Sequence, residues 1–190
     1  MKKSITVYGA SSSSLTPIYT ETAYRLGQAI ARAGVTVITG GGRTGMMAAV
    51  EEGAMAEGGE TIGVIPEFMI ERGWHHKGLS KLEIVPDMHT RKAMMARLAD
   101  AVIALPGGIG TFEELFEIIT WRQLGLFGGN IVIFNINNYY APILSMFGQA
   151  ISEGFMRPDH KELFTVTESI EEALSAALAE PQEHSFSPKF

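Results

Sequence analysis

The sequence predicts an α/β protein, a single-domain, Rossmann-like, doubly wound parallel sheet of about seven strands flanked by helices. Short apolar segments rich in β-branched residues alternate with longer segments of helical periodicity. Continuous hydrophobicity is expected of parallel strands that helices cover on both faces. A chain of 190 residues suits one such domain. We therefore expect residues 1–180 to form one Rossmann-like domain and residues 181–190, which are polar and contain proline, to be a frayed tail.

The individual elements follow from the same alternation. The expected strands are Ile5–Tyr8, Val35–Thr39, Thr61–Ile65, Leu82–Val85, Ala101–Leu105, Ile131–Phe134 and Phe164–Val166. The expected helices are Thr16–Ala33, Gly45–Glu57, Asp87–Leu98, Thr111–Leu124, Tyr139–Glu153 and Thr167–Leu178. The segment Pro66–Ser80 has no clear periodicity and predicts one long loop. Loops of this size in a compact domain often serve a function.

Composition excludes several classes of protein. The net charge is −6 and no Lys/Arg run stands out, which argues against a nucleic-acid partner. The chain has no cysteine, so disulfides, cysteine zinc sites and thiol nucleophiles are excluded. His75 and His76 lack the spacing of a metal motif, so we expect no metal. No segment reaches the length of a signal peptide's apolar core or a membrane span, and we expect a cytoplasmic protein without a membrane partner.

The first glycine-rich loop follows the second strand, where ligands bind in doubly wound sheets. Gly40, Gly42 and Gly45 match the dinucleotide-binding pattern G-x-G-x-x-G. However, Glu60, 20 residues after Gly40, precedes its strand, whereas a ribose-binding acid should follow one. Glu67 does follow the next strand, but it comes late and after a proline. Met46 stands where a P-loop needs lysine. Three interpretations stay open: a structural turn, an NAD(P) site, or backbone donors for another phosphate ligand.

The second glycine-rich loop, PGGIGT at residues 106–111, follows the fifth strand. Glycines allow the backbone to approach a ligand and to point N–H groups toward it. The next helix adds the positive end of its dipole, which favours an anion such as phosphate. Each loop alone fits a structural turn. Two such loops at one edge of a sheet indicate a nucleoside monophosphate or a phosphosugar.

An arginine occurs on an apolar helix face in DMHTRKAMMARLAD, where Asp87 is a suitable N-cap. Arg91 falls inside the arc formed by Met88, Met94, Met95, Leu98 and Ala99. Burying an unpaired arginine is costly. Arg91 therefore either reaches solvent or a structural carboxylate, or faces a pocket where it binds an anion or a catalytic carboxylate.

The helix after the second loop presents a similar choice. Thr111 and Glu114 have the T-x-x-E spacing of a capping box. Glu114 also shares a stripe with Ile118 and Trp121, which favours a position in the pocket. The helix is apolar around most of its circumference and should be buried on two sides. We expect a homodimer with the Thr111–Leu124 helix near the interface.

Three motifs together resemble the Lonely Guy family of cytokinin-activating phosphoribohydrolases. They are PGGIGTFEE, MHTRK and GGGRTGMM, and the resemblance covers roughly Ile5 to Leu178. Members have also carried a "lysine decarboxylase" label. Nothing in the sequence looks like a pyridoxal phosphate site, and we expect no cofactor.

The resemblance implies a nucleotide-monophosphate-binding domain that hydrolyses the N-glycosidic bond of an adenosine 5′-monophosphate, N6-modified in the family's usual substrates. The products would be the free base and ribose 5-phosphate. Arg91 and Glu114 match the residues regarded as catalytic, and the loop from Gly108 to Thr111 matches the phosphoribosyl site. The predicted substrate-binding residues are Ser11, Gly42, Glu71, Met88, Lys92, Gly107, Gly108, Ile109, Gly110, Thr111, Phe112, Glu113 and Thr120.

The sequence departs from the family pattern in three places. Gly9-Ala10-Ser11-Ser12 replaces Cys-Gly-Ser-Ser, and Ala48 replaces a glycine. Glu71-Arg72-Gly73-Trp74 replaces Glu-Arg-Glu-Leu, so the contact of the second glutamate is missing or moved to Glu71. These changes bear on base specificity more than on the reaction. A non-catalytic nucleotide- or phosphosugar-binding protein and an NAD(P)-binding enzyme using Gly40–Gly45 are the alternatives, and retention of Arg91 and Glu114 favours the hydrolase.

Overall fold

The structure is a computed structural model that describes residues 3–181. The strands are β1 (Ser4–Tyr8), β2 (Thr36–Thr39), β3 (Thr61–Pro66), β4 (Lys81–Val85), β5 (Ala101–Ala104), β6 (Asn130–Phe134) and β7 (Thr165–Thr167). The helices are α1 (Pro17–Arg32), α2 (Gly45–Ala56), α3 (Glu67–Glu71), α4 (Met88–Leu98), α5 (Ile109–Gln123), α6 (Ala141–Ser152) and α7 (Ile170–Leu178), with 3₁₀ segments η1 (Ile136–Asn138) and η2 (Pro158–Leu163). The domain boundary at residue 180 stays a prediction, and the predicted tail lies outside the described residues from residue 182 onward.

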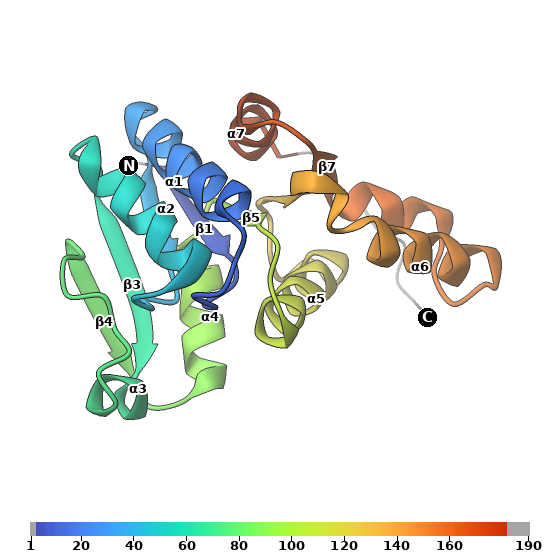
Figure 1. The fold of residues 1–190 in the computed structure, drawn as a ribbon. Helices are drawn as coiled ribbons and strands as arrows, with labels where there is room; N and C mark the ends of the chain where they lie inside the picture. Colours follow the sequence, from blue (N-terminus) through green and yellow to red (C-terminus); the bar gives the residue numbers. More distant parts are fainter. Residues whose placement is uncertain (1–2, 182–190) are drawn as a thin grey trace.

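The predicted fold class is confirmed. The strands form one parallel sheet in the order β4-β3-β2-β1-β5-β6-β7 (Figure 1). The chain winds outward from β1 to β4, then crosses back to continue from β5 on the other side of β1. The connections after β1 and β5 therefore diverge, and this switch point leaves a crevice at the carboxyl ends of the strands.

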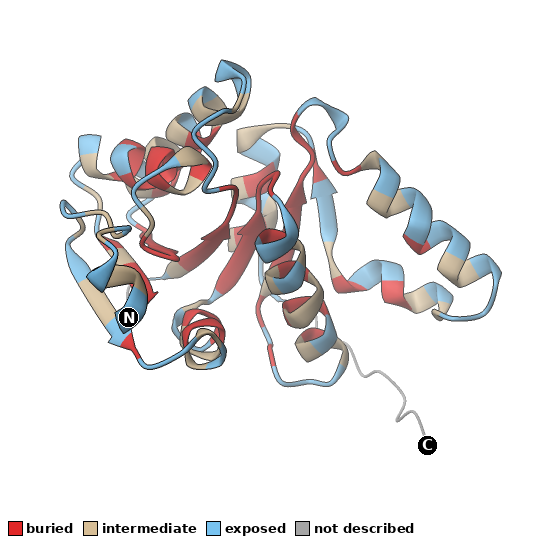
Figure 2. Cartoon of the chain, turned by 60° about the horizontal axis from the view of Figure 1, so that its bottom comes forward, coloured by how far each residue is buried: buried red, intermediate tan, exposed pale blue. Residues whose placement is uncertain are grey.

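Helices cover the sheet on both faces. On one face, α1, α2 and α7 pack on an apolar cluster that includes Leu26, Val50 and Ala173. On the other face, α4, α5 and α6 pack on a second cluster that includes Met95, Leu115 and Phe147. The central strands are buried along their length, whereas the helices expose their outer surfaces (Figure 2). This two-sided burial explains why the central strands are almost continuously apolar, whereas the edge strands β4 and β7 are partly exposed.

Two predictions about local structure need correction. The helix expected from Thr111 begins two residues earlier, at Ile109, after the extended N-cap Gly108, so the T-x-x-E spacing did not mark its start. The segment Pro66–Ser80 is not a featureless loop, since it contains α3 and is tied to the first glycine-rich loop. His75 forms an isolated bridge with Gly42, and the His76 N–H donates to the Gly41 carbonyl at 2.9 Å.

No helix among the described residues is both long and apolar enough to span a bilayer. Residues 3–181 also contain no group of three or more histidines and carboxylates arranged to hold a metal ion.

Candidate active site

A cavity of about 740 Å³ opens at the carboxyl ends of the central strands. Its walls come from the segments that follow β1, β2 and β3 and from the first turns of α4 and α5. Among the predicted site residues, Ser11, Gly42, Met88, Arg91, Gly108, Ile109, Gly110, Thr111 and Glu114 line it. The topology thus brings together residues that are up to about 100 positions apart in the chain, as expected at a switch point.

Arg91 projects from α4 into the floor of the cavity and is only 6% exposed. Its Nε donates to the Val64 carbonyl at 3.0 Å, and its Nη1 lies 3.0 Å from Glu114 Oε1. A Cβ at Gly40 would lie 1.6 Å from Arg91 Nη2, so the guanidinium packs directly against this glycine. The two alternatives for Arg91 therefore coexist: it pairs with a carboxylate, and it does so at the cavity wall.

Glu114 points into the cavity and does not cap its helix. No side chain caps the start of α5, whereas Glu114 Oε1 accepts the hydrogen bond from Arg91. Burial raises the pKa of Glu114, and the neighbouring Arg91 cation opposes that rise. A carboxylate in this balance is suited to general-base work or to stabilising a nearby cation.

The first glycine-rich loop is held by a buried side-chain relay. The Thr39 hydroxyl accepts from the Gly41 N–H at 3.0 Å and donates to Glu51 Oε1. Glu51 is 0% exposed, and burial raises its pKa to about 8. Gly41 has a φ of +67°, which favours glycine. Sequence reasoning missed this relay, because Glu51 looks like any other glutamate on a helix.

The second glycine-rich loop presents free backbone donors. The N–H groups in the first turn of a helix have no partner within the helix, and this turn of α5, with Gly108, lines the cavity. A Cβ at Gly107 would lie 2.1 Å from Thr111 Oγ1, so the loop folds tightly onto α5. Backbone donors and the helix dipole together favour an anion at this position.

Several predicted contact residues do not line the cavity. Lys92 lies between α4 and α5, where its Nζ is 2.7 Å from Glu113 and 3.2 Å from Glu117. Burial alone would lower the pKa of Lys92, but these two partners raise it overall. The others outside the wall are Glu71, Gly107, Phe112, Glu113 and Thr120. Their roles in substrate binding stay predictions.

Residues that the sequence analysis did not assign to the site complete the wall. They are Gly9, Ala10, Ser12, Gly40, Arg43, Thr44, Met47, Ile65, Met69 and Trp74. Arg43, Thr44 and Met47 lie within the quoted GGGRTGMM motif, which could have indicated them. The Trp74 ring has the Arg72 guanidinium 5.0 Å from its centroid. The backbone carbonyl of Trp74 accepts a hydrogen bond from the Arg43 N–H at 3.0 Å.

The NAD(P) alternative loses Glu60, the acid at the dinucleotide-motif spacing. Glu60 accepts from Thr36 Oγ1 at 3.0 Å, at the start of β2 and before β3. This position is at the amino edge of the sheet, whereas the cavity is at the carboxyl edge. Glu60 therefore cannot contact a ribose bound at the glycine-rich loops.

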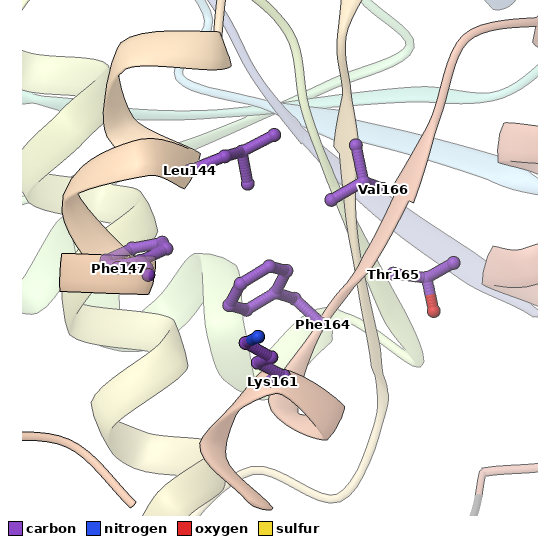
Figure 3. Close-up of a pocket in the computed structure, with 7 residues that line it drawn as sticks. Leu144, Phe147, Lys161, Phe164, Thr165 and Val166 are labelled. Atoms are coloured by element: carbon purple, nitrogen blue, oxygen red, sulfur yellow. The ribbon is translucent and has the colours of Figure 1, made fainter. Parts of the chain in front are cut away.

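A second hollow of about 440 Å³ lies between α6 and β7 (Figure 3). Its wall is mainly apolar, and the Phe164 and Phe147 ring centroids are 5.4 Å apart. Lys161 is the only charged residue among those that line it. The hollow therefore lacks an acid–base pair, unlike the cavity at Arg91 and Glu114.

The chain is similar over most of its length to members of one protein family. Residues 47–177 match the family described as "Possible lysine decarboxylase". The cytokinin riboside 5′-monophosphate phosphoribohydrolase of Rhodococcoides fascians is 44% identical over 92% of this chain and 88% of its own length. The Arabidopsis thaliana enzyme of the same name, LOG7, is 41% identical over 82% of this chain and 72% of its own length.

Solved structures show the same fold in more distant proteins. The molybdenum cofactor binding protein of Rippkaea orientalis superposes with a TM-score of 0.72 at 23% identity, covering 92% of this chain and 94% of that one. The Moco carrier protein of Chlamydomonas reinhardtii has a TM-score of 0.70 at 22% identity, covering 93% and 95%. At this identity the likeness concerns the fold alone.

Proposed function

This chain belongs to the family described as possible lysine decarboxylase, among relatives that are cytokinin riboside 5′-monophosphate phosphoribohydrolases, and from that premise we propose that it is a nucleoside 5′-monophosphate phosphoribohydrolase. It cleaves the N-glycosidic bond of an adenosine 5′-monophosphate, N6-modified as in the cytokinins, to the free base and ribose 5-phosphate. A decarboxylase using pyridoxal phosphate needs a lysine for the Schiff base. None of the residues that line the cavity is a lysine, and Lys92 is held by two glutamates outside it.

The order of groups along the cavity supports this assignment. The Gly108–Thr111 donors follow β5, the Arg91–Glu114 pair packs beneath Gly40 after β2, and the apolar side chains of Met69 and Trp74 follow β3. From β5 to β3 the sheet crosses three strand spacings, roughly 14 Å at about 4.8 Å each. A nucleotide laid across them places its phosphate at α5, its ribose at the Arg91–Glu114 ion pair and its base against the apolar wall.

The chemistry follows from the pair in the middle. Cleavage passes through an oxocarbenium-like state at the anomeric carbon, by analogy with O-glycosides. The Glu114 carboxylate stabilises that cation or removes a proton from the attacking water. The water oxygen bonds to the anomeric carbon while the carbon–nitrogen bond breaks, and the departing base takes up a proton. Arg91 opposes the rise in the pKa of Glu114 that burial causes, and so favours the ionised carboxylate.

The observation that carries the proposal is the Arg91–Glu114 ion pair, which is largely buried yet lines the cavity beside the proposed anion site. The purified protein should release free base from AMP or isopentenyl-AMP. Glu114→Gln should abolish release while leaving ribose 5-phosphate binding and the fold intact. Glu21→Gln, at an exposed position on α1, is the matched control with the same charge change. Absence of base release from every nucleoside monophosphate tested would refute the proposal.

The active form is proposed to be a homodimer with α5 near the interface. Support comes from exposed apolar side chains along and beyond this helix, at Ile109, Leu124 and Leu126. Analytical ultracentrifugation should show a dimer, and Leu124→Lys together with Leu126→Lys should shift it to monomer. A wild-type protein that is monomeric at assay concentration would contradict this part. A cytoplasmic location is proposed as well, supported by a chain without cysteine.

A further inference from the structure

Two consecutive tyrosines reach the backbone of the second glycine-rich loop. The Tyr139 hydroxyl donates to the Gly107 carbonyl at 2.6 Å, and the Tyr140 hydroxyl donates to the Leu105 carbonyl at 2.7 Å. Both carbonyls belong to the short connection between β5 and α5. Neither tyrosine lines the cavity. They therefore contact the loop from behind.

The tyrosines are themselves fixed in place. Asn135 Oδ1 accepts from the Tyr140 N–H at 2.8 Å, and Asn135 Nδ2 donates to Asn138 Oδ1 at 3.2 Å. Asn137 and Asn138 have φ values of 51° and 58°, a conformation that non-glycine residues adopt at a cost. The segment after β6 thus holds a strained turn that delivers two adjacent hydroxyls to one loop.

The Tyr139 ring has aromatic neighbours on two helices. It stacks on Phe112 of α5 with centroids 6.4 Å apart and meets Tyr19 of α1 edge-on at 6.3 Å. Tyr140 is 0% exposed, and burial raises the pKa of its hydroxyl. The Tyr140 hydroxyl consequently stays protonated and remains a donor to Leu105.

A fixed carbonyl also fixes the next amide. In a trans peptide the C=O and the following N–H point in opposite directions, and the described chain contains no cis peptide bond. Turning the Gly107 carbonyl toward Tyr139 therefore turns the Gly108 N–H away from it. Gly108 lines the cavity, so this N–H becomes one of the donors at the anion site.

We propose that Tyr139 and Tyr140 are positioning residues for the phosphate, setting the direction of the loop's N–H donors through the Gly107 and Leu105 carbonyls. The inference rests on the proposed function for the identity of the anion. It predicts an effect on the binding of ligands that carry a phosphate and none on the chemistry at the anomeric carbon, because the hydroxyls of both tyrosines bond to the loop carbonyls rather than to Arg91 or Glu114.

The test is Tyr139→Phe, which removes the hydroxyl and keeps the ring. A single net hydrogen bond contributes about 1 kcal/mol, so KM for AMP and the dissociation constant for ribose 5-phosphate should rise about 3- to 10-fold. The value of kcat for AMP, and the rate of base release from adenosine, which has no phosphate, should stay within about twofold. Tyr19→Phe, in the same aromatic cluster, is the control and should match wild type.

Equal losses with AMP and adenosine, or unchanged ribose 5-phosphate binding, would overturn the inference. Tyr140→Phe leaves the buried Leu105 carbonyl without its donor and should lower the melting temperature as well. Ribose 5-phosphate titration by calorimetry keeps the inference separate from the proposed function. If wild type releases no base but binds ribose 5-phosphate more tightly than Tyr139→Phe does, the reaction fails and the positioning role stands. If wild type does not bind ribose 5-phosphate, the positioning role fails.

Discussion

Replacing Glu51 by glutamine should change how stability depends on pH. The Glu51 side chain is 0% exposed on α2, and one oxygen accepts from the Thr39 hydroxyl. Burial raises its pKa from 4.5 to about 8. The folded protein therefore keeps a proton on Glu51 at neutral pH, whereas the unfolded chain releases it.

The sign and size follow from linkage. Between pH 4.5 and 8 the folded state binds more protons than the unfolded state, so the free energy of unfolding falls as pH rises through this window. The shift of about 3.5 units, from 8 − 4.5, corresponds to about 5 kcal/mol in total at 1.36 kcal/mol per unit. About 2.5 kcal/mol of that loss falls between pH 5 and 7.

Urea unfolding at pH 5 and pH 7 measures the effect. Glutamine cannot ionise. Between pH 5 and pH 7 the free energy of unfolding of Glu51→Gln should therefore fall by about 2.5 kcal/mol less than that of wild type. An amide in place of the carboxyl has its own constant cost, but that cost cancels in the difference between pH values. Glu21→Gln, an exposed neutralisation on α1, should track wild type. Parallel pH dependence of wild type and Glu51→Gln would refute the reasoning.

Three further predictions concern the cavity. Because burial raises the pKa of Glu114, kcat/KM should increase with pH through a midpoint above 4.5. A midpoint at or below 4.5 would contradict the raised pKa, and activity that falls as pH rises would contradict an ionised Glu114 as the working form. Gly40→Ala should displace the Arg91 guanidinium and lower kcat by about 100-fold, whereas Gly148→Ala, which meets open space, should not. Trp74→Ala should raise KM for isopentenyl-AMP about 10-fold more than KM for AMP, and equal changes would exclude Trp74 from contact with the N6 substituent.

The central strands were predictable because helices bury both of their faces, which leaves continuous apolar segments such as Val102–Ala104. The start of α5 was not. Its T-x-x-E pattern suggested a helix beginning at Thr111, but the helix begins at Ile109 behind a glycine cap. Side-chain capping and a ligand compete for the same backbone donors. A helix that keeps those donors for a ligand has no capping side chain, so its first residue cannot be recognised from a capping motif in the sequence.

The site was predictable where a residue contradicted its surroundings. Arg91 stood out on an apolar arc, and the stripe that Glu114 shares with Ile118 and Trp121 placed it in the pocket. That these two residues, 23 positions apart, act on each other followed only from the family resemblance. Lys92 shows the opposite case. Successive residues on a helix differ by about 100°, so Arg91 and Lys92 cannot both face the cavity, and Lys92 instead pairs with glutamates of α5. Glu51 gave no signal, since its burial depends on the packing of α2 against the sheet.

The Arg91–Glu114 pair is difficult to explain by stability alone. Desolvating two charges costs several kcal/mol per ion, and apolar residues of similar volume are often as stable or more so. This pair also requires a glycine at position 40, because any side chain there would meet the guanidinium. Three positions are thus constrained to bury an ion pair at a cavity wall beside free backbone donors. Chemistry at an anionic ligand accounts for all three, whereas core packing accounts for none.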